Sequence, residues 1–161
     1  MWREHAVETA KVLNQINPDF IQVRTLKVLK TMLLFQKIGK GEFILMSDDE
    51  MIEEERLLIQ HLEGITSTFV SDHIMNLLQE VEGKLPEEKE KMLNLIDRYL
   101  SLPKEEKDGF RLGRRVGVYQ SVEDLSKPEL KNRVERVLQQ IESKRPGEIE
   151  EVLSELTESF I

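Results

Sequence analysis

The sequence predicts an α/β fold in which an incomplete parallel β/α unit precedes a mainly α-helical C-terminal region. Two compact segments, 20–25 and 65–70, carry the apolar and β-branched residues typical of strands, and helical patterns separate them. A strand–helix–strand crossover of this length pairs its strands in parallel. After Leu85 only helical patterns follow, so we expect two parts, residues 1–84 and 85–161. Two parallel strands do not complete an α/β sheet, so we expect the first part to need further strands or a partner.

Composition limits the classes of function. The chain has 161 residues and a net charge of −8, so it has no overall attraction for phosphate backbones and we expect no nucleic-acid partner. Its apolar stretches are too short to span a bilayer, so we expect no membrane partner. The N-terminal segment lacks the long apolar region of a secretory signal, which makes the cytoplasm the expected location. There is no cysteine, so this chain supplies no thiolate nucleophile, disulfide or cysteine ligand for zinc or iron–sulfur clusters.

Apolar periodicity predicts three helical segments in the first part. They are residues 2–16, residues 28–38, and a helix that starts after Ser47 and ends at Gly64. The start of the third helix has the strongest signal, because Ser47 and Glu50 form a capping-box pattern.

Prolines mark the helix starts in the second part. Amphipathic patterns predict helices from Pro86 to Leu102, from Pro103 past Phe110 and Leu112, from Pro128 to Ile141, and from Pro146-Gly147 to Phe160. Ser121 is expected to cap a turn that contains Glu123 and Asp124. Nothing indicates the role of residues 120–161.

The stretch TFVSDHIMNLL, residues 68–78, places polar side chains directly after the second strand. One interpretation is that Ser71 or Asp72 caps a helix that begins near Ile74. The other is that Asp72 and His73 line a pocket, because the carboxyl ends of parallel strands often hold functional groups. A hydrolase that uses these two residues would lack an accompanying nucleophile or metal set.

Arginines give two further candidates. Arg24 and Thr25 lie at the equivalent end of the first strand, where the arginine either pairs with a carboxylate or binds an anionic group. The other candidate is a basic cluster, for which a salt-bridged face is favoured over a phosphate site; its members are Arg111, Arg114 and Arg115. The glutamate runs at 53–55 and 148–151 are interpreted as solvated helix faces.

Three segments together resemble a known family. They are WREHAVETAKVLNQINPDFIQVRTL, GEFILMSDDEMIEEERLLIQHLEGITSTFVSDHIMNLLQEVEGKLPEEKEKML and GRRVGVY. In this order they closely resemble the C-terminal part of radical S-adenosylmethionine (radical SAM) proteins, in an uncharacterised subgroup often labelled iron–sulfur oxidoreductases. The resemblance covers roughly residues 2–119.

The resemblance implies a partial β/α barrel in which the strand at 20–25 is a late one. In such proteins a CxxxCxxC motif after the first strand holds a 4Fe–4S cluster that binds S-adenosylmethionine. By the same resemblance, Arg24 and Thr25 are cofactor-binding candidates. Asp72, His73 and Asn76 are candidates for the substrate side.

This chain departs from the family because CxxxCxxC and the early barrel strands are absent. We therefore expect that the chain alone binds no cluster, cleaves no S-adenosylmethionine and has no catalytic or metal-ligating residues of its own. The expected function is that of the C-terminal portion of a radical SAM enzyme, which closes the barrel and the substrate pocket. This portion is expected to be inactive without the cluster-binding N-terminal half. The alternative is a stand-alone, non-catalytic helical interaction module that oligomerises.

Overall fold

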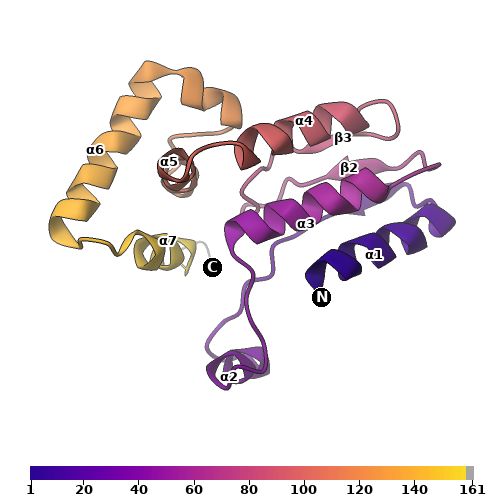
Figure 1. Cartoon of the computed structure of the whole chain (residues 1–161), viewed down its shortest axis with the longest axis horizontal. Coiled ribbons are helices and arrows are strands. Elements are labelled where there is room, and N and C mark those ends of the chain that lie inside the picture. The colour runs from indigo at the N-terminus through magenta and orange to yellow at the C-terminus, as the bar shows by residue number, and fades with distance from the viewer. Residues whose placement is uncertain (159–161) are drawn as a thin grey trace.

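The computed structural model describes residues 1–158 and has a mixed α/β fold (Figure 1). In chain order its elements are α1 (Trp2–Ile16), β1 (Phe20–Gln22), α2 (Leu33–Gly39), α3 (Asp48–His61), β2 (Thr68–Val70), β3 (Glu82–Lys84), α4 (Lys89–Leu100), α5 (Lys104–Arg115), the 3-10 helix η1 (Val122–Ser126), α6 (Pro128–Lys144) and α7 (Ile149–Glu158). The predicted end of the last helix at Phe160 lies outside the described residues.

The strands form one sheet of order β1-β2-β3. β1 and β2 are parallel, with Phe20 opposite Thr68, so the predicted parallel pair is confirmed. β3 pairs antiparallel with β2 and was not predicted, because its sequence, Glu82-Gly83-Lys84, has no β-branched or aromatic residue. Its position is set by backbone pairing with β2 rather than by its own propensity.

Helices cover one face of the sheet. The central residue of each strand is buried, and these residues are Ile21, Phe69 and Gly83. Ile21 and Phe69 join a hydrophobic cluster with residues of α1, α3 and α4, which run side by side over the strands in Figure 1. On the opposite face the Phe20 side chain is 69% exposed and Gln22 is also exposed. The sheet is therefore apolar and covered on one side and open on the other.

The two edges of the sheet differ. At the β3 edge, the Lys84 backbone N–H donates to the Glu88 carboxylate at 2.9 Å, so this outward donor is occupied. At the other edge, Asp19 O and Val23 N bond to β2, and the alternation of a strand turns the main-chain groups of Phe20 and Gln22 outward. No strand among residues 1–158 pairs with that side of β1.

The capping box at the start of α3 is confirmed. The Ser47 backbone N–H donates to Glu50 Oε2 at 2.8 Å, and the Glu50 N–H donates to Ser47 Oγ at 3.3 Å. These bonds satisfy donors that the first turn of a helix leaves free. The helix ends at His61, and Gly64, at φ +67°, adopts the left-handed conformation just beyond it.

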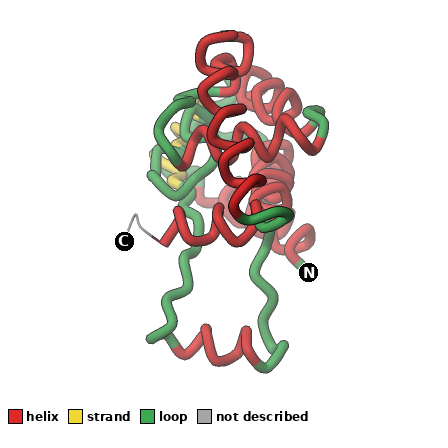
Figure 2. Tube along the Cα trace, turned by 90° about the vertical axis from the view of Figure 1, so that its left-hand side faces the viewer, coloured by secondary structure: helices red, strands yellow, loops and turns green. Residues whose placement is uncertain are grey.

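Residues 24–46, which we call the arm, begin at the end of β1, and the part that contains α2 projects from the rest of the molecule. In Figures 1 and 2, α2 lies apart from the other helices at the end of two long connecting segments. None of the residues of α2 is buried. The predicted helix at 28–38 is realised only as Leu33–Gly39, because a short helix without a surface to pack against is marginally stable.

The C-terminal helices extend the same hydrophobic cluster. The Phe110 ring lies between Tyr99, with ring centroids 5.6 Å apart, and Tyr119, with centroids 5.9 Å apart. One hydrophobic cluster therefore contains residues from both halves of the chain, from Ala6 in α1 to Leu153 in α7. Pro86 lies in the turn before α4, which begins at Lys89, so the predicted helix start at Pro86 is wrong. Within residues 1–158, no helix is both long and apolar enough to cross a membrane.

Candidate functional site

Polar side chains gather where β1 and β2 end. Gln22 Nε2 donates to Asp72 Oδ1 at 2.9 Å, and Arg24 Nη2 donates to Gln22 Oε1 at 3.3 Å. Because the two strands are parallel, their carboxyl ends meet at one edge of the sheet. Arg24 and Asp72 are both exposed on this edge, so the structure brings these two sequence-predicted candidates together through Gln22.

Thr25 and Asn76 form a second, partly buried contact at the same edge. The Thr25 N–H and hydroxyl donate to Asn76 Oδ1 at 2.8 and 3.0 Å. Asn76 Nδ2 in turn donates to Val23 O, Ser71 O and Ser71 Oγ at 3.0 to 3.1 Å. Asn76 is 6% exposed, so its whole amide is used to fasten the two strand ends to each other. Asn76 therefore holds the segments after β1 and β2 in place, and its amide is occupied by bonds within the chain.

His73 and Asp72 do not form a relay. Asp72 is bonded to Gln22, whereas the half-buried His73 accepts the Met75 N–H on Nδ1 at 3.3 Å. The predicted helix near Ile74 is wrong, because residues 71–81 form turns with no helix. The Asn76 side chain explains this outcome: it donates to the main-chain carbonyls of Ser71 and of the distant Val23, and these bonds compete with helical geometry. Ser71 and Asp72 are therefore not helix caps.

A buried acid lies behind this edge. Burial raises the pKa of Glu55 to about 8, an effect that the Ser71 hydroxyl opposes by hydrogen bonding and the nearby Glu80 charge reinforces. Within the described chain, Glu55 Oε1 has no hydrogen-bond partner. The interpretation of residues 53–55 as a solvated face is thus wrong for Glu55. Its helical position, one turn before Ile59 on the buried side of α3, was the signal in the sequence.

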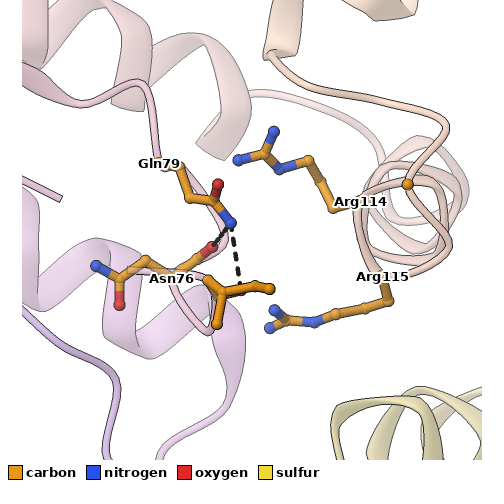
Figure 3. Close-up of a pocket in the computed structure, with 6 residues that line it drawn as sticks. Asn76, Gln79, Arg114 and Arg115 are labelled. Atoms are coloured by element: carbon orange, nitrogen blue, oxygen red, sulfur yellow. Dashed lines mark hydrogen bonds between the residues drawn. The ribbon is translucent and has the colours of Figure 1, made fainter. Parts of the chain in front are cut away.

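Figure 3 shows a cavity next to the turns at residues 71–81. It has a volume of about 170 Å³ and is lined by Ile74, Asn76, Gln79, Arg114, Arg115 and Gly117. A neighbouring cavity of about 450 Å³ shares Gln79, Arg114 and Gly117 with it. In the figure the Arg114 guanidinium points toward Gln79. Sequence reasoning missed Gln79, which belongs to no motif and enters the site only through the turns after Asn76.

The basic cluster is a set of internal ion pairs. Arg111 donates to Asp48 at 2.9 Å and to both oxygens of Glu150 at 2.7 and 2.8 Å. Burial opposes its charge, but the bonds to Glu150 and Asp48 prevail and raise the pKa of Arg111. The favoured interpretation of a salt-bridged face is confirmed, and it extends inward, since the side chain of Arg111 is only 13% exposed.

Arg114 and Arg115 brace the loop after β2. Arg114 Nε donates to Leu77 O at 2.9 Å, and Arg115 Nη1 donates to Met75 O at 3.1 Å. Arg114 Nη2 lies 3.4 Å from the carboxylate of Glu80. Burial lowers the pKa of Arg114 and raises that of Glu80, because both charges are removed from water. Arg115 and Nε of Arg114 are thus bonded to the main chain, whereas Nη2 of Arg114 is buried and makes no hydrogen bond within the described residues.

No metal site is evident in residues 1–158, which contain no group of three His, Cys, Asp or Glu side chains placed to hold an ion. No protein-family model matches the chain, and neither the curated proteins nor the solved structures contain a match. The site is therefore characterised by its own geometry: an exposed Arg24–Gln22–Asp72 chain beside a buried Asn76 fastening.

Proposed function

We propose that the chain is the C-terminal portion of a radical SAM iron–sulfur enzyme, in which it closes a partial barrel and its substrate pocket. The supporting observation is the one-sided sheet, with helices on one face, Phe20 and Gln22 exposed on the other, and an unpaired outer edge on β1. In a β/α barrel, helices lie outside, strand side chains alternate toward the interior, and each strand has a neighbour on both sides. β1 fits such a barrel strand: one face is covered by helices, β2 is its neighbour on one side, and the other side is free to pair with a further strand.

The exposed strand ends would then face the substrate side. Arg24 and Asp72 lie on that edge with opposite charges, joined by Gln22, and the guanidinium is suited to hold an anionic group. Thr25 and Asn76 would position this edge rather than touch a ligand, because their polar atoms are already bonded to each other and to the main chain. His73 is a further candidate beside Asp72.

The residues of this chain do not fit an iron–sulfur cluster. It has no cysteine, and the described residues offer no alternative group of three ligands. In the proposed enzyme, the cluster and its S-adenosylmethionine belong to a part that carries CxxxCxxC. The role of this chain is to complete the sheet, exclude water and position polar groups at the strand ends.

The experiment starts with the reading frame upstream of the Met1 codon and the neighbouring genes. A β/α part with CxxxCxxC encoded there is expressed with this chain, reconstituted anaerobically with iron and sulfide, and assayed for 5′-deoxyadenosine release. We expect a bound cluster, and we expect Arg24→Gln to impair turnover while Arg133→Gln, at an exposed arginine of α6, does not. The absence of any such part, or a complex without a cluster, would overturn the proposal.

A second function, self-association as an interaction module, is favoured by the arm. Its large apolar side chains are exposed in the single chain, and exposed apolar surface of this extent marks an interaction site. Sedimentation velocity on the purified chain tests this, and a monomer at all concentrations contradicts it.

A further inference from the structure

We propose that the arm of one copy docks on α1 of a second copy, and that two reciprocal contacts of this kind close a dimer. The inference rests on the self-association proposed above and not on the radical chemistry. It concerns residues 24–46 and the outer surface of α1, so it leaves the free edge of β1 available.

The arm is apolar where it meets solvent. Leu33 and Ile44 are 78% and 84% exposed, and none of the residues of α2 is buried. The large apolar side chains exposed along the arm are Leu26, Met32, Leu33, Phe35, Phe43, Ile44 and Leu45. Figure 2 shows that α2 stands clear of the other helices, and the exposed fractions show that these side chains face solvent and not the chain's own core.

The arm is also basic in an acidic chain. It contains five basic residues, Arg24, Lys27, Lys30, Lys37 and Lys40, and one acidic residue, Glu42. Its net charge is therefore +4, and because the whole chain carries −8, the remaining residues carry −12. The arm complements the charge of the rest of the molecule, and a second copy supplies that acidic surface.

The outer surface of α1 offers a matching site. Val12 and Ile16 are 54% and 63% exposed, and together with Glu8 they follow a four-residue spacing that places them on one side of the helix. Glu8 is paired with Lys11, whose Nζ donates to its carboxylate at 2.6 Å, so the charges on this side of the helix are balanced. The surface is thus an exposed apolar stripe, which is the counterpart of the exposed apolar side chains of the arm.

A second copy explains the surface better than an anionic bilayer does. A bilayer would attract the arm but repel the residues that carry −12. Each copy has one arm and one α1 stripe, so a two-fold axis satisfies both surfaces at once and leaves no unmatched arm. Apolar burial drives such a contact, and the charges orient it.

The test measures the dimerisation constant of the full chain by sedimentation velocity. We expect a wild-type dimer, and we expect the arm variant Leu33→Asp/Ile44→Asp and the α1 variant Val12→Asp each to weaken it by more than about tenfold. All three positions are exposed, so the thermal melting of each variant should match the wild type. Ile74→Asp is the control matched to Val12→Asp, because Ile74 is 53% exposed, Val12 is 54% exposed, and Ile74 lies on neither surface.

Mixing identifies the contact. The Val12→Asp chain keeps an intact arm, and the arm variant keeps an intact α1, so an equimolar mixture should associate through one remaining contact. A mixture that stays monomeric overturns arm-to-α1 docking. A dimer that Phe20→Asp abolishes while the arm variant does not also overturns it, but leaves self-association through the β1 edge. A wild-type monomer overturns both proposals, and a monomer that binds anionic vesicles through the arm assigns the arm to lipid.

Discussion

At the scale of single residues, one amide joins two segments that are about fifty positions apart in the chain. Asn76 accepts from Thr25 and donates to Val23 and Ser71, all within 3.1 Å. Neither the pairing nor its importance could be predicted, because an asparagine in an apolar stretch gives no local signal of a long-range partner. What the sequence did predict was the location, since both residues follow parallel strands that end at the same edge.

Asn76→Ala should be strongly destabilising. The change leaves the Thr25 N–H and the Val23 carbonyl in a site with no replacement partner, so we expect a loss of about 3 kcal/mol in the free energy of unfolding. Urea denaturation measures it. Gln79→Ala is the control, because the amide of Gln79 makes only two long bonds, at 3.2 and 3.4 Å, and should cost less than about 1 kcal/mol. Equal losses would show that Asn76 has no special role.

Glu55 should make stability depend on pH. Burial holds its folded pKa at about 8, above the usual 4.5, so between these values the folded chain binds a proton that the unfolded chain has released. The contribution of Glu55 to the free energy of unfolding is therefore complete below pH 4.5. It is lost as the pH rises toward 8, by up to about 1.4 kcal/mol per pH unit. Denaturant unfolding at several pH values measures it, and Glu55→Gln should flatten the profile. An unchanged profile in the variant contradicts the assignment.

At the scale of elements, two glycines of α5 should respond in opposite ways to alanine. A Cβ at Gly113 would lie 2.6 Å from Cε2 of Tyr119, inside the aromatic stack, whereas a Cβ at Gly109 would meet only ordinary contacts of 3.7 and 3.8 Å. We expect Gly113→Ala to destabilise by about 2 kcal/mol through overpacking. Gly109→Ala should stabilise by about 0.5–1 kcal/mol through helix propensity. Thermal melting compares them, and similar effects would contradict the packing of Tyr119 on α5.

Elements with complete local signals were predicted well. The capping box of α3 depends only on Ser47 and Glu50, and it formed as expected. The turns at 71–81 and the strand β3 were missed because both depend on distant partners: Asn76 bonds to Val23, and Glu82–Lys84 pairs with β2. Apolar residues at 74–78 suggested a helix, but Met75, Leu77 and Leu78 are buried without helical geometry and Ile74 is exposed.

At the scale of the whole molecule, the arm should be the first part of the dilute chain to be cleaved by trypsin. Lys27, Lys30, Lys37 and Lys40 lie on a segment whose helix has no buried residue, so opening it costs little free energy. Mass spectrometry of a time course should show cuts there before any cut in α4 or α5. Raising the protein concentration should slow these cuts if the arm is docked. Early cleavage at Lys107, an internal lysine bonded to Asp49, would contradict this order.

The two unequal edges of the sheet have a consequence for aggregation. Growth of a fibre through edge-to-edge strand pairing requires that each molecule has a free sheet edge on two opposite sides. Here Glu88 occupies both the N–H and the carbonyl of Lys84 on the β3 side, so among the strands that the structure describes β1 has the free edge. Strand addition at β1 therefore stops after one neighbour has joined, so the described sheet does not extend into a fibre through edge-to-edge pairing.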